Sequence, residues 1–154
     1  MSRHHLLVGS WRLDRWIVVD AAGERPSPYF GGKQAGYVVY GPDGICAMHL
    51  EHADRALRRD DDPSSAGDDE IVAATRGVLS YMARYVLDEE HDRLVHTIFA
   101  CTWPNWVGMQ QTRYVEACAQ HLTLRTPPVA REGLVTFAEL AFTRVRATPR
   151  SSGA

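Results

Sequence analysis

The sequence contains almost no lysine. Lys33 is the only lysine among 17 basic residues, and the formal net charge is −2. A chain without a basic excess lacks the electrostatic footprint of a nucleic-acid-binding protein, so nucleic acid is excluded as the expected partner. Arginine suits planar, bidentate contacts better than lysine does, although a biased genome composition would produce the same count.

The sequence also has few cysteines and no long hydrophobic run. Cys46, Cys101 and Cys118 lie far apart and lack the close pairing of zinc sites. The stretch Leu6-Leu7-Val8 is shorter than a signal-peptide core, and no run approaches the ~20 apolar residues of a membrane helix. We therefore expect a soluble cytoplasmic protein with reduced thiols, no bound metal and no membrane partner.

The length of 154 residues, with 45% hydrophobic and 23% charged residues, is typical of one globular domain. A chain of this size buries roughly two thirds of its unfolded surface, so it needs no disulfide or metal for stability. We predict one domain over residues 1–147. The small, polar residues 148–154 predict a disordered tail.

Periodicity predicts strands separated by turns. The clearest element is a hairpin, in which Gly36–Tyr40 and Ile45–Leu50 flank the turn Gly41–Gly44. The acidic residues that begin at Asp68 precede an apolar stretch, which predicts a short helix over 68–78. Further strands are expected over 10–19, 81–87, 94–101, 110–116, 122–126 and 134–145, and polar loops over 20–33 and 51–69.

These elements amount to about eight strands, mostly in consecutive hairpins, with one helix inserted after the third. An antiparallel meander of this size closes into an up-and-down barrel, which removes exposed edges and leaves room for one small ligand. A β-sandwich is the weaker alternative, because most successive strands are joined by short connections. The predicted fold class is therefore an all-β barrel with one short helix.

An ordered set of motifs resembles a family of bacterial and fungal lipocalin-like domains. Gly9-Ser10-Trp11 is similar to the Gly-x-Trp opening of lipocalin-type barrels. Further similar segments are the hairpin 36–44, Arg76-Gly77 with Tyr81, Tyr85 and 88–90, Pro104–Gly108 with Arg113, and 122–128. The resemblance covers roughly residues 6–145.

The resemblance implies a lipocalin-like barrel that carries an apolar ligand or catalyses cyclisation, isomerisation or dehydration of a polyketide or terpenoid. Members are often encoded in secondary-metabolite pathways. A haem-binding relative has a longer Gly-x-Trp-x-Gly-x-Gly opening, from which this chain departs after Trp11. In lipocalins an arginine of the last strand packs on the tryptophan of the first, and Arg144 is placed to do so.

Alternation predicts which polar residues face the interior. The strand 94–101 has His96 on the face opposite Arg93, and the two neighbouring strands place further polar groups on the matching face. Together they predict an interior cluster of Tyr81, Tyr85, His96, Gln111 and Arg113. Burying an imidazole or a guanidinium without partners costs several kcal/mol, so such a cluster in an apolar barrel favours a binding site.

The predicted catalytic residues are His96, Arg113 and Tyr85. His96 would act as a general base or acid near neutral pH, Arg113 would hold a carboxylate or a developing enolate, and a tyrosine would orient or protonate an oxygen. The structural alternative makes Arg113 a plug stacked on an aromatic ring and His96 a satisfied core residue. The predicted ligand-binding residues are Tyr81, Gln111, Tyr40, His49, Trp106 and Glu139.

Three of these residues have a second interpretation. Trp106 belongs to an aromatic loop that is either a rim over the ligand or a packed plug. His49 precedes Glu51 and His52 and suggests a metal, yet a solvated strand end explains the same residues. Glu139 interrupts an apolar strand and would be a carboxylate base only if it faces inward.

The predicted barrel and its interior polar cluster are compatible with two functions. The first is a cofactor-independent enzyme that performs acid–base cyclisation, isomerisation or dehydration on an apolar oxygenated molecule. The second is a non-catalytic carrier of a small hydrophobic ligand. The sequence shows no Gly-rich phosphate loop and no paired-carboxylate motif, which disfavours nucleotide chemistry and glycoside hydrolysis. The expected assembly is a monomer or a homodimer without a cofactor.

Overall fold

A computed structural model describes residues 3–56 and 62–146. The tail predicted at 148–154 lies outside these residues. The helical elements are α1 (His4–Leu7), α2 (Asp68–Arg76) and three 3-10 turns, η1 (Tyr29–Gly32), η2 (Pro63–Ser65) and η3 (Pro104–Trp106). The strands are β1 (Gly9–Asp20), β2 (Gly23–Pro26), β3 (Gln34–Tyr40), β4 (Ile45–His52), β5 (Val78–Asp88), β6 (Arg93–Cys101), β7 (Gln110–Ala117), β8 (His121–Arg125), β9 (Val129–Arg131) and β10 (Leu134–Arg144).

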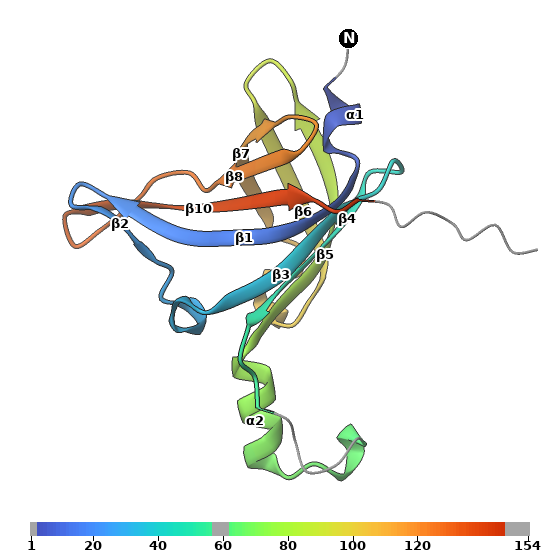
Figure 1. Cartoon of the computed structure of the whole chain (residues 1–154), viewed down its shortest axis with the longest axis vertical. Helices are drawn as coiled ribbons and strands as arrows, with labels where there is room; N and C mark the ends of the chain where they lie inside the picture. The colour runs from blue at the N-terminus through green and yellow to red at the C-terminus, as the bar shows by residue number, and fades with distance from the viewer. Residues whose placement is uncertain (1–2, 57–61, 147–154) are drawn as a thin grey trace, which may run out of the picture.

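Eight of these strands form a closed antiparallel barrel (Figure 1). Their order is β1-β3-β4-β5-β6-β7-β8-β10, and β10 pairs with β1 to close the sheet. The predicted all-β barrel and the helix after its third strand are confirmed. The short strands β2 and β9 were not expected. They form because β1 and β10 extend beyond the barrel and offer free backbone groups there.

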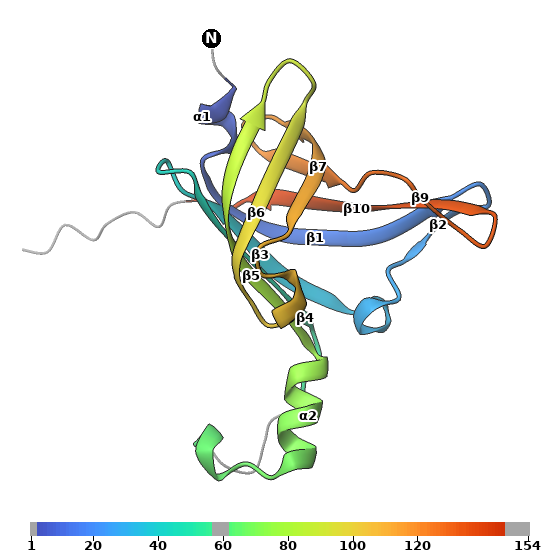
Figure 2. The same cartoon turned by 180° about the vertical axis from the view of Figure 1, so that it is seen from behind.

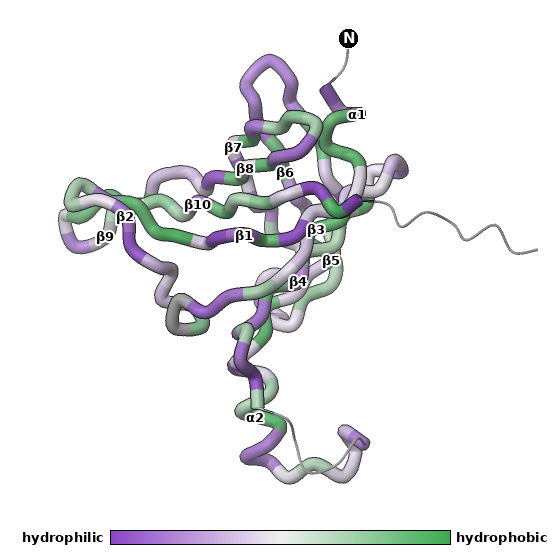
Figure 3. Tube along the Cα trace, viewed as in Figure 1, coloured by the Kyte–Doolittle hydropathy of each residue, from purple (hydrophilic) through white to green (hydrophobic). Residues whose placement is uncertain are grey.

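The predicted β3–β4 hairpin is confirmed, and its residues alternate between an inward and an outward face. Gly44 has a φ of 80°, which suits a turn, and Ile45 N–H donates to the Asp43 carboxylate at 3.2 Å. Val38 and Met48 pair across the two strands and are buried, whereas Tyr37 on the opposite face is exposed. Figure 3 shows hydrophobic positions concentrated on the barrel strands and hydrophilic stretches around α2.

The helix α1 closes one end of the barrel. Trp11 is fully buried, and its Nε1 donates to the Leu7 carbonyl at 2.8 Å. The Arg144 guanidinium lies 4.0 Å from the centre of the Trp11 ring, which confirms the predicted pair. Gly9 has a φ of 136°, and a Cβ there would lie 2.5 Å from Arg144 Nη1. Only glycine therefore fits beside this arginine.

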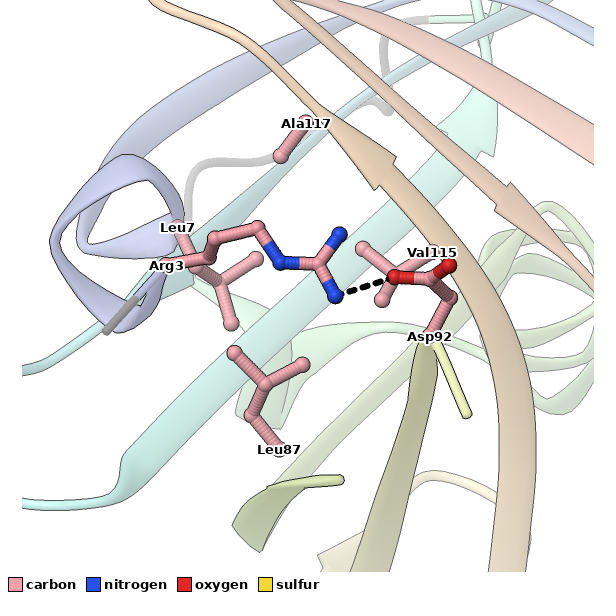
Figure 4. Close-up of a pocket in the computed structure, with 6 residues that line it drawn as sticks. All are labelled: Arg3, Leu7, Leu87, Asp92, Val115 and Ala117. Carbon is pink, nitrogen blue, oxygen red and sulfur yellow. Dashed lines mark ion pairs between the residues drawn. The ribbon is translucent and has the colours of Figure 1, made fainter. Parts of the chain in front are cut away.

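A small cavity lies just beneath α1 (Figure 4). It has a volume of about 20 Å³, and an ion pair between Arg3 and Asp92 crosses it. Apolar side chains, including Leu7 and Leu87, form most of its wall. A space of this size holds about one water molecule, so this pocket is too small for an organic ligand.

The opposite end carries η1, η3 and the connection that contains α2 (Figure 2). Inner-face residues near this end, such as Leu79 and Ala138, are partly exposed, whereas Leu94, Leu122 and Phe142 are buried. Gln111 and Arg113 on the inner face of β7 are partly exposed as well. Solvent therefore reaches inner-face side chains at the η1–η3 end. The aromatic loop around η3 lies at this end, and its Trp103 is 58% exposed.

Candidate functional site

His96 lies at the centre of a buried polar group. It is 0% exposed, and each ring nitrogen contacts a tyrosine hydroxyl. Nε2 lies 3.2 Å from the hydroxyl of Tyr40 on β3, and Nδ1 lies 3.0 Å from the hydroxyl of Tyr81 on β5. Three strands that are separate in sequence thus contribute one residue each. We call Tyr40, His96 and Tyr81 the Tyr–His–Tyr group.

Burial and the nearby Arg113 charge lower the pKa of His96 to about 3. The imidazole is therefore neutral at pH 7, whereas the sequence led us to expect a group that titrates near neutral pH. A neutral imidazole has one N–H and one lone pair, so one tyrosine accepts a hydrogen bond and the other donates one. The accepting tyrosine keeps its own hydroxyl proton for a further acceptor.

Burial also raises the pKa of both tyrosines. The Arg113 charge opposes this effect in each case, since it favours the phenolate form. Arg113 is thus electrostatically coupled to all three members of the Tyr–His–Tyr group.

Arg113 supplies a positive charge that no carboxylate neutralises within residues 3–56 and 62–146. It lies on β7, two residues from Gln111, which pairs with His96 across the sheet. Its Nη1 donates to the Thr112 carbonyl at 2.8 Å, and its Nη2 donates to Gln111 Oε1. Both partners are neutral, so the partly exposed guanidinium can still bind an anion.

Tyr85 has its ring near this group but its hydroxyl elsewhere. Its ring packs edge-on against Tyr40, with centroids 5.0 Å apart. The hydroxyl donates to the Gly41 carbonyl at 2.7 Å and contacts His4 Nε2 at 2.8 Å, so it points towards α1. Burial raises the pKa of Tyr85 to about 12. Tyr40 and Tyr81, rather than Tyr85, are the tyrosines whose hydroxyls lie beside His96.

Two further predicted residues belong to the same neighbourhood. Trp106 of η3 packs against the Tyr81 ring, with centroids 6.5 Å apart. It is partly buried against the core and extends the aromatic wall towards the η1–η3 end. Gln111 holds the Arg113 guanidinium.

Glu139 and His49 lie away from the site. Glu139 is on the face of β10 opposite the core residue Leu140, and its two carboxylate oxygens accept hydrogen bonds from Arg15 at 2.7 Å and Arg125 at 2.8 Å. It does not provide an interior base. His49 is on the outer face of β4, where it contacts Glu51 at 3.2 Å. Strand alternation accounts for both positions.

The parts of the chain that the structure describes contain no cluster of His, Cys, Asp or Glu able to hold a metal ion. Their helices include none long and apolar enough to span a membrane. Cys46, Cys101 and Cys118 are all free thiols.

One residue of interest did not stand out in the sequence. Trp16 of β1 is 8% exposed, and its indole N–H is buried without a hydrogen-bond partner in the described structure. Its ring stacks on Tyr29 with centroids 5.1 Å apart and meets Phe30 edge-on. The sequence feature that could have pointed to Trp16 is the aromatic pair Tyr29 and Phe30 in an otherwise polar loop.

A closed eight-stranded barrel, sealed at one end by the N-terminal helix and accessible at the other, defines the class of lipocalin-like proteins. The family model for the lipocalin-like domain matches residues 8–145, and the chain belongs to this family. No curated protein matches the chain significantly. Small-molecule binding inside the barrel is the general use of this architecture.

Proposed function

We propose that the protein binds a small, largely apolar molecule through an acidic oxygen, with Arg113 as the counter-charge. The acidic oxygen is a carboxylate, a phenolate or an enolate. The observation that carries this proposal is the Arg113 guanidinium on the inner face of the barrel, which no carboxylate of the described residues neutralises. A barrel needs no interior charge for packing, and a partly buried guanidinium with only neutral partners is stabilised when a ligand supplies an anion.

The surroundings of Arg113 fit such a ligand. The Arg113 charge acts on Tyr40 and Tyr81, whose aromatic rings are buried, and Trp106 packs on the Tyr81 ring. Mostly apolar walls with a few convergent polar groups are typical of small-molecule sites. The polyketide- or terpenoid-like intermediates implied by the sequence resemblance carry oxygens of this kind on apolar skeletons.

Replacement of Arg113 by glutamine tests this proposal. We expect the wild-type protein to bind 2-naphthoic acid and the Arg113→Gln protein to bind it about tenfold more weakly, because a charge-assisted hydrogen bond is lost. The neutral analogue 2-naphthamide should bind both proteins within about threefold, because it carries no charge. Isothermal titration calorimetry measures all four affinities.

The matched control is Arg84→Gln, because Arg84 is an exposed arginine on the outer face of β5. It should bind 2-naphthoic acid as the wild type does. Absence of binding to the wild-type protein, or equal binding to the Arg113→Gln protein, would contradict the proposed anion site.

A second candidate function is catalysis, and the Tyr–His–Tyr group favours it. A chain of hydroxyl, imidazole and hydroxyl can move a proton to or from a ligand carbon while Arg113 stabilises the resulting enolate. Because His96 is neutral, its role would be to relay a proton rather than to act as an acid. Cofactor-independent cyclisation, isomerisation and dehydration all include such a step. The cytoplasm is the proposed location of this activity.

Hydrogen exchange at a carbon next to a ketone tests the catalytic candidate. In D2O the protein should speed up α-proton exchange of 2-tetralone, measured by NMR, and Tyr81→Phe should reduce the protein-dependent rate about tenfold. Tyr114→Phe is the control, because Tyr114 is an exposed tyrosine on β7. If the wild-type protein gives only the buffer rate, the barrel is a carrier.

A further inference from the structure

The orphan indole N–H of Trp16 is a second polar group inside the barrel. A buried N–H without an acceptor costs free energy, and buried polar groups in folded proteins are almost always paired. Trp16 Nε1 has no partner among the described residues although the ring is 8% exposed. A bound molecule that offers an oxygen would supply the missing acceptor.

Strand pairing places Trp16 on the same inner surface as Arg113. Trp16 pairs with Leu140, Leu140 with Leu124, and Leu124 with Val115. Residues paired across a sheet share a face, and these leucines are in the core. Arg113 lies two residues from Val115 on the same face of β7.

Three steps between neighbouring strands, at about 4.8 Å each, separate β1 from β7 along this wall. The two donors therefore project inward from separate parts of one surface. The side chains that lie between the two donors in this row, those of Leu140, Leu124 and Val115, are apolar.

The η1 segment covers Trp16 at the accessible end of the barrel. Ser27 N–H donates to the Trp16 carbonyl at 3.1 Å, and Gln34 Nε2 donates to the Tyr29 carbonyl at 3.1 Å. Phe30 has a φ of 58°, a conformation that is costly for a bulky residue and that clusters at ligand-binding segments. The segment is thus held over the Trp16 ring at the cost of local strain.

We propose that Trp16 donates a hydrogen bond to a second, neutral oxygen of the ligand. The ligand is then an extended, mostly apolar ring system with an acidic oxygen at Arg113 and a carbonyl or hydroxyl oxygen at Trp16. This inference rests on the proposed anion site and adds the substrate class to it.

Two probes that differ by one hydroxyl test the second contact. We expect 6-hydroxy-2-naphthoic acid to bind the wild-type protein about fivefold more tightly than 2-naphthoic acid, as one hydrogen bond predicts. Trp16→Phe keeps an aromatic ring but removes the N–H, so the two probes should bind it equally. Trp103→Phe, at an exposed tryptophan, should keep the preference.

A spectroscopic measurement keeps the proposal testable if Trp16→Phe fails to fold. In 15N-labelled protein the hydroxylated probe should shift one indole N–H resonance downfield, and 2-naphthoic acid should not. Equal wild-type affinities for the two probes, or a preference that persists in Trp16→Phe, would overturn the Trp16 contact alone. Failure of both probes to bind the wild type would instead overturn the proposed anion site.

Discussion

Replacement of Arg144 by alanine is expected to lower the free energy of unfolding by about 3 kcal/mol. The guanidinium donates to the carbonyls of Ala119 at 2.7 Å, Val8 at 2.9 Å and Leu6, and it covers the Trp11 ring. One side chain thus joins the α1–β1 connection to the β7–β8 turn. Alanine removes three charge-assisted hydrogen bonds and a cation–π contact together.

Denaturant unfolding followed by tryptophan fluorescence measures this effect. Arg144→Lys should recover only a minor part of the loss, because a single ammonium cannot reach three carbonyls in the geometry of a planar fork. Arg12→Ala is the matched control, because Arg12 is exposed and its ion pair with Asp14 is long, at 3.7 Å. A change below 1 kcal/mol in Arg144→Ala would contradict the role assigned to this residue.

The second large effect concerns the pH dependence of stability. Between pH 6.5 and the folded pKa of about 3, the unfolded chain binds a proton at His96 and the folded protein does not. The contribution of the neutral His96 to the free energy of unfolding is therefore complete above pH 6.5 and is lost as the pH falls towards 3. Its size between pH 6.5 and 4.5 is about 2 kcal/mol, since one pKa unit corresponds to about 1.4 kcal/mol.

His96→Gln should remove this part of the pH dependence, because glutamine keeps a donor and an acceptor but does not titrate. The groups that face His96, namely Tyr40, Tyr81 and Arg113, keep their charge states over this range. Carboxylates with lowered pKa, such as Asp88 and Glu51, are common to both proteins and cancel in the comparison.

Denaturant unfolding at several pH values gives the two slopes. His121→Gln, at an exposed histidine, should retain the wild-type slope. A His96→Gln protein with an unchanged slope would show that the buried imidazole binds a proton in the folded state.

Much of the fold could be predicted because its signals are local. The Pro42-Asp43-Gly44 turn, the alternation in β6 and the acidic start of α2 each act within a few residues. The helix α1 and the strands β2 and β9 were missed for the opposite reason. Each is too short to form alone and exists because of contacts with β1, β10 or the closed end of the barrel.

The candidate site was predictable in its faces but not in its contacts. Alternation correctly placed His96, Tyr81 and Arg113 on inner faces. The same pattern could not show that the Tyr85 hydroxyl turns towards His4, because that contact joins residues 81 positions apart. Nor could it show that Glu139 is buried on the outer face of β10 beneath its two ion-pair partners, Arg15 and Arg125.

The sequence by itself determined the family, the meander of strands and the side of each strand that turns inward, since these depend on motifs and on a period of two residues. The tertiary structure alone decided which end of the barrel α1 covers and which hydroxyls reach His96. It also decided that, among the described residues, Arg113 has no carboxylate partner and the Trp16 indole N–H has no acceptor. Those properties depend on closure of β1 onto β10, which brings distant residues together. At Arg144 the use of arginine rather than lysine has a structural reason, because its planar guanidinium donates to three carbonyls that one ammonium could not reach together.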